Sequence, residues 1–331
     1  MPQPTLQQVH VSAALSNIAV AYLQSDDNYI ADKVFPNVPV EHQTDKYFVY
    51  RKSDFFRDEA QLRADATESA GSGFNLDTQT YSAGVYALHK DIGDQTRRNA
   101  DPAVDLDSAT TRFLMQKLLI KRDRIFVADY MKTGVWGTDI TGVASAPSGS
   151  TQVYQWSDDA NSDPFTDISN GQTTILQNTG YEPNTLVLGW PVYQALRKHP
   201  LVIDRIKFTM QADAKNITPE LLAAAFDVER VTVAKATYNT AAEGATESYS
   251  FIVGKTALLC YSAPAPGLMV PSAGYTFGWS GYSGINSLGV ATYDIPMPWL
   301  GKNTNRIECE MAFDMQVVSS SMGYYFTSIV A

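Results

Sequence analysis

The sequence has few of the residues that usually carry metal or covalent chemistry. Its 331 residues include two cysteines and four histidines. Cys260 and Cys309 have no CxxC neighbour, so we expect two small buried hydrophobes, with one long-range disulfide as the open alternative. The histidines show no HxxxH or HxH spacing beside a carboxylate. We therefore predict no metal site, and a structural role for His199 at the expected end of a helix.

Catalytic and phosphate-binding motifs are absent as well. The chain has no GxSxG elbow, no GxxxxGK(S/T) loop and no GxGxxG fingerprint. The glycine-rich stretches 71–73 and 278–284 lack the required spacing. Neighbouring carboxylates at 26–27, 58–59 and 158–159 lie in loop-like sequence, where such pairs are usually solvated. The sequence thus predicts no catalytic residues, no cofactor and no enzymatic activity.

Charge is scarce, and positive charge most of all. Charged residues make up 18% of the chain, where ~25% is common, and 25 Lys and Arg face 35 Asp and Glu for a net charge of −10. This balance argues against a protein that grips nucleic acid through a dominant basic face. No run of ~18 apolar residues predicts a membrane span and no secretory signal is visible, so we expect synthesis in the cytoplasm.

Aromatic residues, in contrast, are plentiful: 18 Tyr, 14 Phe and 5 Trp. Many aromatics with little charge predict that something other than water covers part of the surface. The length allows two domains, or one domain with an excursion, and the apolar content of 44% fits a folded globular protein.

Residues 1–44 read as an extended arm. A short amphipathic piece spans 15–23, and two prolines within 34–40 forbid a helix or a central strand there. We expect the apolar side chains of 34–40 to be covered by another subunit; a frayed terminus is the alternative.

Residues 45–100 read as a long two-stranded excursion. Strand-like flanks at 47–51 and 80–89 bracket a charged, glycine-containing middle that holds several aromatics but few aliphatic residues. An insertion of this kind is usually functional or disordered, and its aromatics argue against disorder. We predict a hairpin that rests on a neighbouring molecule, with an ordinary surface loop as the alternative.

A long helix is expected next. Asp101 and Pro102 offer an N-cap and N1 pair, and the pattern continues to Lys132, before Gly134. One face is apolar and the other basic, and that basic face is either solvated or meets acidic surface on a partner.

The rest of the chain mixes strands and helices. We predict loop over 134–169, a buried strand at 185–188, a helix opened by Pro191, a helix capped at Thr218, and a half-buried strand over 306–315.

Two stretches carry a family resemblance. TLVLGWPVYQALRKHPLVIDRIKFT (Thr185 to Thr209), and VFPNVPV (Val34 to Val40) with YFVYRKSDFFRDEAQLRADATES (Tyr47 to Ser69), resemble segments of tailed-phage major capsid proteins of the Hong Kong 97 type. The resemblance implies an α+β fold divided into an N-terminal arm (1–44), an extended β-hairpin loop (45–100), a long spine helix with the first part of a peripheral domain (101–165), an axial domain (166–270) and a β-rich return to the peripheral domain (271–331).

The resemblance also implies a function. The chain would self-assemble as a homo-oligomer of pentamers and hexamers into an icosahedral phage head. That head would enclose double-stranded DNA without strong specific binding, and it would be assembled in the host cytoplasm and found in the virion. Separate scaffolding, portal and decoration proteins are candidate partners; no membrane is involved.

We expect contacts between subunits at a set of apolar and basic side chains from the arm, the loop and the helix: Val34, Phe35, Val38, Phe55, Phe56, Arg57, Phe74, Arg122 and Arg124. Some relatives form a Lys–Asn cross-link. That pair does not map onto this chain, although Lys46, Lys52 and Lys90 lie in or near the loop and Asn303 and Asn305 near the last long strand. We predict no cross-link.

Two other functions remain open. One is an encapsulin-like nanocompartment shell of the same fold. The other, from a different class, is a soluble β-rich hydrolase or carbohydrate-binding protein, suggested by Trp136, Trp156 and Trp279, which would need to be exposed.

Overall fold

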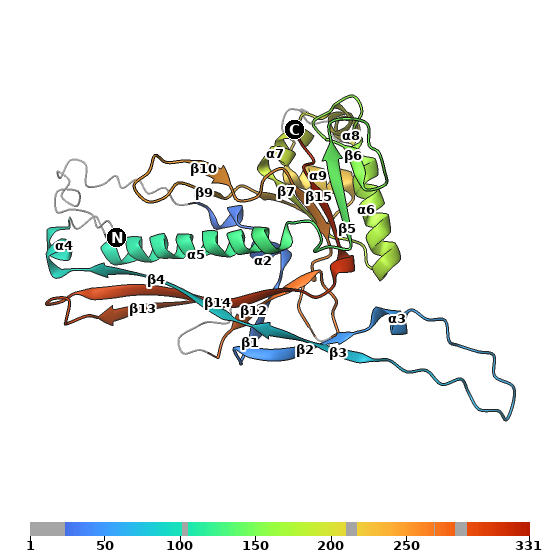
Figure 1. Ribbon diagram of the computed structural model, residues 1–331, viewed down its shortest axis with the longest axis horizontal. Helices are drawn as coiled ribbons and strands as arrows, with labels where there is room; N and C mark the ends of the chain where they lie inside the picture. Colours follow the sequence, from blue (N-terminus) through green and yellow to red (C-terminus); the bar gives the residue numbers. More distant parts are fainter. Residues whose placement is uncertain (1–23, 101–104, 210–216, 268, 282–289) are drawn as a thin grey trace.

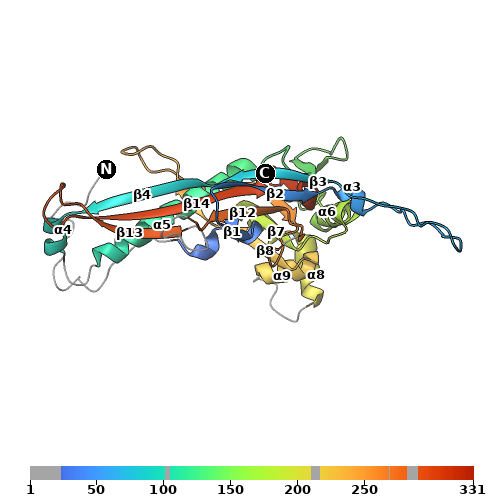
Figure 2. The same cartoon turned by 90° about the horizontal axis from the view of Figure 1, so that it is seen from below.

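A computed structural model describes residues 24–100, 105–209, 217–267, 269–281 and 290–331. The chain forms a long layer of strands under one long helix, a lobe built on a second sheet, and a thin hairpin that projects from the layer (Figure 1). Seen from below, the long strands and the hairpin run nearly end to end (Figure 2). This is a mixed α and β architecture, as expected from the sequence.

The long layer is a five-stranded sheet. Its members are β1 (Asn37–Val40), β12 (Gly274–Trp279), β14 (Asn305–Val317), β13 (Val290–Pro296) and β4 (Gly84–Ile92). β14 pairs antiparallel with β12, β13 and β4, while β1 pairs parallel with β12 at the edge. Every second residue of β14 from Ile307 to Met315 belongs to the buried core, which confirms the predicted half-buried strand.

The long helix α5 (Leu106–Tyr130) packs on this sheet. Its 25 residues span about 37 Å at 1.5 Å per residue. The predicted start at Asp101 is wrong. Asp105 is the N-cap, because its carboxylate accepts the backbone N–H groups of Asp107 and Ser108; residues 101–104 lie outside the described part. Leu114, Leu118 and Phe126 are buried against the sheet.

The lobe contains a six-stranded sheet in the order β6 (Gln152–Tyr154), β5 (Thr138–Val143), β15 (Gly323–Thr327), β11 (Ala257–Cys260), β7 (Thr185–Gly189) and β8 (Arg230–Ala234). Four helices accompany it: α6 (Pro164–Thr179), α7 (Trp190–Leu196), α8 (Pro200–Thr209) and α9 (Pro219–Phe226). β7, α7 and α9 confirm local predictions, and Thr218 caps α9 as expected. A small hairpin of β9 (Thr237–Asn239) and β10 (Tyr249–Phe251) runs alongside α5 (Figure 1).

The prediction of loop over 134–169 is wrong. Those residues contribute β5, β6 and the start of α6. β5 pairs with β15, a strand far away in the sequence, so its local pattern carried little signal. Because β5, β6 and β15 share the six-stranded sheet with β7 and β11, that sheet draws on residues outside 166–270. The five segment boundaries themselves stay predictions.

The projecting hairpin consists of β2 (Thr44–Tyr50) and β3 (Leu76–Ser82), paired antiparallel, with the short helix α3 (Lys52–Phe55) after β2. The predicted second flank, 80–89, is divided between two elements. β3 pairs with β2, and β4 pairs with β14 after a break at the buried Ala83. The remaining short elements are η1 (Asp26–Asn28), α2 (Ala31–Val34), α4 (Asp94–Asn99) and η2 (Ser320–Met322).

Candidate assembly surfaces

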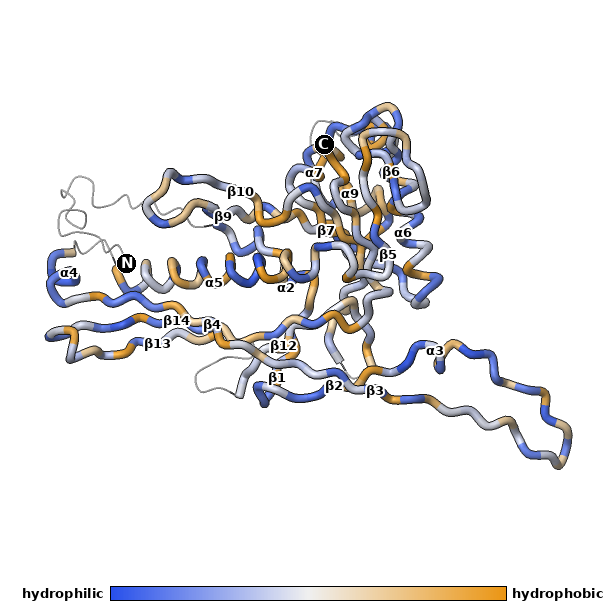
Figure 3. The backbone as a smooth tube through the Cα atoms, in the orientation of Figure 1, coloured by the Kyte–Doolittle hydropathy of each residue, from blue (hydrophilic) through white to orange (hydrophobic). Residues whose placement is uncertain are grey.

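The outer end of the projecting hairpin, residues 51–75, extends away from the rest of the chain (Figure 1). It carries apolar side chains without an apolar core. Phe55 is 51% exposed, Phe56 61% and Phe74 63%, and Leu62 is fully exposed. Figure 3 shows scattered apolar positions along this hairpin, whereas the apolar residues of the lobe gather on its sheet. An exposed surface of this kind marks an interaction site or an aggregation hazard.

Two of these aromatic rings form a small cluster with Tyr50, the last residue of β2, at the base of the outer end. The rings of Tyr50, Phe55 and Phe74 lie 5.8 to 5.9 Å apart, centroid to centroid. Such contacts stabilise a local arrangement but leave much of each ring in water. Phe56 lies instead beside Gly180, where a Cβ atom would meet its ring at 3.6 Å. The hairpin therefore touches the end of α6 in its own chain.

Polar contacts fix the base of the outer end. The Asp54 carboxylate accepts the backbone N–H of Asn75 at 2.9 Å, and chiefly this bond lowers the pKa of Asp54. Arg51 bonds Asp77 across the strand pair at 2.7 Å, and Arg57 lies 3.7 Å from Asp54. The aromatic side chains are thus held in a defined conformation before any partner arrives.

The N-terminal segment, residues 24–40, behaves differently, because the chain itself buries part of it. Val34 and Phe35 are completely buried, and Phe35 meets Phe126 and Tyr130 of α5 at 5.1 and 5.0 Å. The prediction that another subunit covers these two side chains is therefore wrong. The hydroxyl of Thr276 also donates to the carbonyl of Phe35, which joins the segment to β12.

A buried carboxylate anchors this segment to α5. Asp123 is 1% exposed, and its two oxygens accept the backbone N–H groups of Ile30 and Ala31 at 2.9 and 3.0 Å. Burial raises the pKa of Asp123 to about 6 against the opposing effect of these two hydrogen bonds. Sequence reasoning missed Asp123, because in the run Lys121 to Arg124 it resembles one more solvated charge.

Two further predicted contact residues are engaged within the chain. Arg122 is 8% exposed and forms an ion pair with Asp32, so its prediction as a subunit contact is wrong. Val38 is half-buried against a cluster that includes Tyr81 and Phe277. Arg57 and Arg124 are exposed, and the guanidinium of Arg124 lies 4.6 Å from the ring centre of Tyr238.

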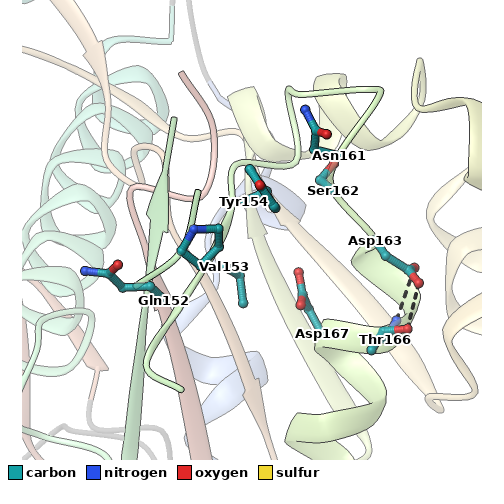
Figure 4. A pocket seen from close by; sticks show the side chains of 9 residues that line it. Gln152, Val153, Tyr154, Asn161, Ser162, Asp163, Thr166 and Asp167 are labelled. Carbon is teal, nitrogen blue, oxygen red and sulfur yellow. Dashed lines mark hydrogen bonds between the residues drawn. The ribbon is translucent and has the colours of Figure 1, made fainter. Parts of the chain in front are cut away.

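A pocket of about 220 Å³ between β6 and the start of α6 is lined by several polar side chains (Figure 4). Asp163 is the N-cap of α6, and Asp167 accepts a hydrogen bond from the Trp156 indole at 2.9 Å while burial raises its pKa to about 6. Ser162 donates its hydroxyl proton to the carbonyl of Asp158 and lies 3.0 Å from Nε2 of His199. Nδ1 of His199 has no hydrogen-bond partner in the described part of the chain, so no carboxylate orients its ring as in a catalytic triad.

Among the described residues, no group of His, Cys, Asp or Glu could hold a metal ion, and no helix is long and apolar enough to cross a membrane. Cys260 and Cys309 are both buried and free. Burial raises the pKa of both thiols. They are the small buried hydrophobes that the sequence predicts.

The sequence relatives of this chain are both named as capsid proteins of phages. No family model matches the chain. A "Major capsid protein" of Burkholderia phage BcepMu is 26% identical over 230 residues, 69% of this chain and 70% of that protein. A "Major capsid protein" of Pseudomonas phage JBD67 is 24% identical over 332 residues, 97% of each.

Solved structures share the fold at lower identity. A phage-related protein from Bordetella bronchiseptica gives a TM-score of 0.67 at 21% identity, over 92% of this chain and 94% of that one. The capsid of Cyanophage P-SCSP1u gives 0.61 at 11%, over 93% and 90%. A virus-like particle from Pyrococcus furiosus gives 0.53 at 10%, over 89% and 91%. The chain therefore has the fold of phage capsid proteins.

Proposed function

We infer that this chain, which is similar in sequence to two phage major capsid proteins and has the capsid fold, is itself a structural, non-enzymatic major capsid protein. The observation that carries the inference is similarity along nearly the whole chain, 97% of it in one relative, rather than in one motif. Its site of action is then the capsid of the virion.

The finer proposal is that copies assemble into pentamers and hexamers of an icosahedral head that encloses double-stranded DNA. Identical chains close into rings only through heterologous contacts, in which a projecting element of one copy meets a different surface of the next. The outer end of the projecting hairpin supports this arrangement. Its aromatic side chains are both held in place and exposed to water. Such exposure does not stabilise a monomer, so it favours a surface that a neighbouring copy covers.

The side chains that remain as candidate subunit contacts come from the hairpin, β1 and α5: Phe55, Phe56, Phe74, Arg57, Val38 and Arg124. Phe55 and Phe74 are the strongest of these, because both rings are more than half exposed and neither is used elsewhere in the chain's core. The layout into arm, extended loop, spine helix, peripheral domain and axial domain is part of the same proposal.

The test shortens the hairpin without unpairing it. Tyr50 and Leu76 are partners in the strand register, so residues 51–75 can be replaced by an Asn-Gly turn that joins them directly. We expect the shortened chain to keep its circular dichroism spectrum and thermal unfolding, and to form no particles by negative-stain microscopy when expressed with its genomic neighbours. Normal particles from the shortened chain would reject the hairpin's role, and a wild-type chain that stays monomeric would reject the capsid function.

The structure and the sequence relatives bear differently on the two alternatives, the encapsulin-like shell and the soluble carbohydrate-binding protein. The likeness to a virus-like particle keeps an encapsulin-like shell compatible with the fold, but both sequence relatives are phage proteins and favour the phage head. The carbohydrate-binding alternative loses two of its three tryptophans, because Trp136 is 5% exposed and Trp156 is completely buried. Their indole N–H groups donate to the Tyr130 carbonyl and to Asp167, so both rings have structural partners. Trp279 is half-buried, and its indole N–H donates to the Glu41 carbonyl.

A further inference from the structure

One face of α5 gathers positive charge in a chain whose net charge is −10. Lys117, Lys121 and Arg124 are four and three residues apart, which places them on one side of the helix, and all three are exposed. Lys90 of β4 joins them, because its ammonium and that of Lys117 both lie over the ring of Phe113, at 5.9 and 4.5 Å. We call these four cations the basic stripe.

The basic stripe is bordered by aromatic rings instead of carboxylates. Lys121 lies 5.8 Å from the ring centre of Tyr86 on β4, and Arg124 lies 4.6 Å from that of Tyr238 on β9. The stripe therefore follows α5 between β4 and the β9–β10 hairpin, two elements that flank the helix in Figure 1. Cations held over ring faces keep their charge and stay available to a further partner.

The four cations of the basic stripe gather on one surface without counter-charge from the described residues. Within the described part of the chain, no carboxylate forms an ion pair with any of its four members. Eight basic side chains elsewhere do form ion pairs with carboxylates: Lys33, Arg51, Arg57, Arg97, Arg98, Arg122, Lys132 and Arg306. A solvated helix face of mixed sign would show such pairs here too.

We propose that the basic stripe is the surface through which the shell contacts its enclosed double-stranded DNA, by phosphate contacts that do not depend on base sequence. This rests on the proposed capsid function and adds an orientation: the face of the subunit that carries the stripe points to the interior. A row of cations along a helix suits a row of phosphates, and three or four contacts give weak, salt-sensitive binding. An acidic segment of a second copy is the competing occupant, and the assembly measurement described below separates it from DNA.

The test compares two full-length triple variants with the same loss of charge. In the stripe variant, Lys117→Gln, Lys121→Gln and Arg124→Gln remove three cations; in the control variant, Lys198→Gln, Lys255→Gln and Lys302→Gln remove three exposed cations from other surfaces. Unassembled wild-type and variant chains are titrated with a duplex of about 30 base pairs over a range of salt concentrations. Each phosphate contact adds about 0.9 to the slope of log affinity against log salt. We expect the slope to fall by about 2 to 3 in the stripe variant and to stay unchanged in the control.

Assembly is measured in parallel, so that this inference and the capsid function fail separately. The expected result is that both variants form particles, and that formaldehyde treatment of DNA-filled wild-type particles joins DNA to peptides of α5. An unchanged salt slope in the stripe variant overturns the inference, whether or not particles form. Loss of particles with an unchanged slope assigns the stripe to a contact between copies. Absence of particles from the wild-type chain rejects the capsid function instead.

Discussion

The N-terminal segment and the outer end of the projecting hairpin look alike in the sequence and differ in the structure. Both are irregular stretches whose apolar side chains need cover from elsewhere. The first finds that cover at home: Phe35 is completely buried between α5 and β12. The second does not, and Phe74 stays 63% exposed. The N-terminal segment has partners elsewhere in the chain, since β1 pairs with β12 and Asp123 accepts two of its backbone N–H groups. Whether a segment finds such partners depends on the folded chain and cannot be read from the segment's own sequence.

The largest expected effect tests the buried half of this comparison. Phe35→Ala removes a ring that packs on Phe126, Tyr130 and Trp136 and leaves a cavity at the joint between helix and sheet. We expect a loss of about 3–5 kcal/mol in the free energy of unfolding of the unassembled chain, measured with urea. A loss near that of an exposed-site substitution would show that the segment is not part of the core.

The anchoring carboxylate gives the next largest effect. Asp123→Ala leaves the N–H groups of Ile30 and Ala31 without their acceptor in a buried place. We expect a loss of about 1–3 kcal/mol. Hydrogen exchange at those two amides should accelerate in this variant beyond the change in global stability. Unchanged exchange there would mean that Asp123 does not hold the segment.

Asp123 also makes the stability of the folded chain depend on pH. The pKa of Asp123 in the folded chain, about 6, lies above the ordinary value of 3.8, so the ionised form is the one that burial disfavours. Stability that depends on the proton is present below about pH 4 and is lost as the pH rises through 6. Relative to Asp123→Asn, which carries no such proton, wild-type stability should therefore fall by about 2 kcal/mol between pH 4 and pH 7.5. A difference that does not change with pH would contradict this.

Substitutions in the exposed outer end of the hairpin should change the stability of the monomer least. Phe55→Ser with Phe74→Ser removes apolar surface that contributes little to the chain's own core, so the free energy of unfolding should move by no more than about 0.5 kcal/mol. Particle formation should nevertheless be lost, while Leu176→Ser with Leu201→Ser on the lobe, also partly exposed, serves as the matched control. A strongly destabilised monomer would place Phe55 and Phe74 in a core.

Sequence reasoning succeeded where a structure is determined by neighbouring residues. The continuous apolar run of β7, the Thr218 cap of α9 and the alternation of β14 are all readable within a few positions. It failed where the partner lies far away. β5 acquires its pairing from β15, and Asp123 acquires its role from a segment some ninety residues earlier, with an Asp123–Ile30 separation of 93.

The predicted contact residues divide in the same way. Phe55, Phe56 and Phe74 are exposed as expected, since nothing in their own chain is shaped to receive them fully. Val34, Phe35 and Arg122 have partners within the chain that local sequence pattern does not reveal, so their prediction as subunit contacts is wrong. Basic charge on the long helix was visible in the sequence, but only the structure separates the buried Arg122 from the exposed side chains of the basic stripe.

The position of β15 in the six-stranded sheet bears on when the subunit can fold. β15 lies between β5 and β11, so within the described sheet β5 and β6 are joined to the strands on the far side only through pairing with β15. Neither half of the sheet can join the other until residues 323–327 have left the ribosome. Long-range closure of this kind is slow and leaves nascent chains unfinished. The lobe is therefore complete only in a chain that includes β15.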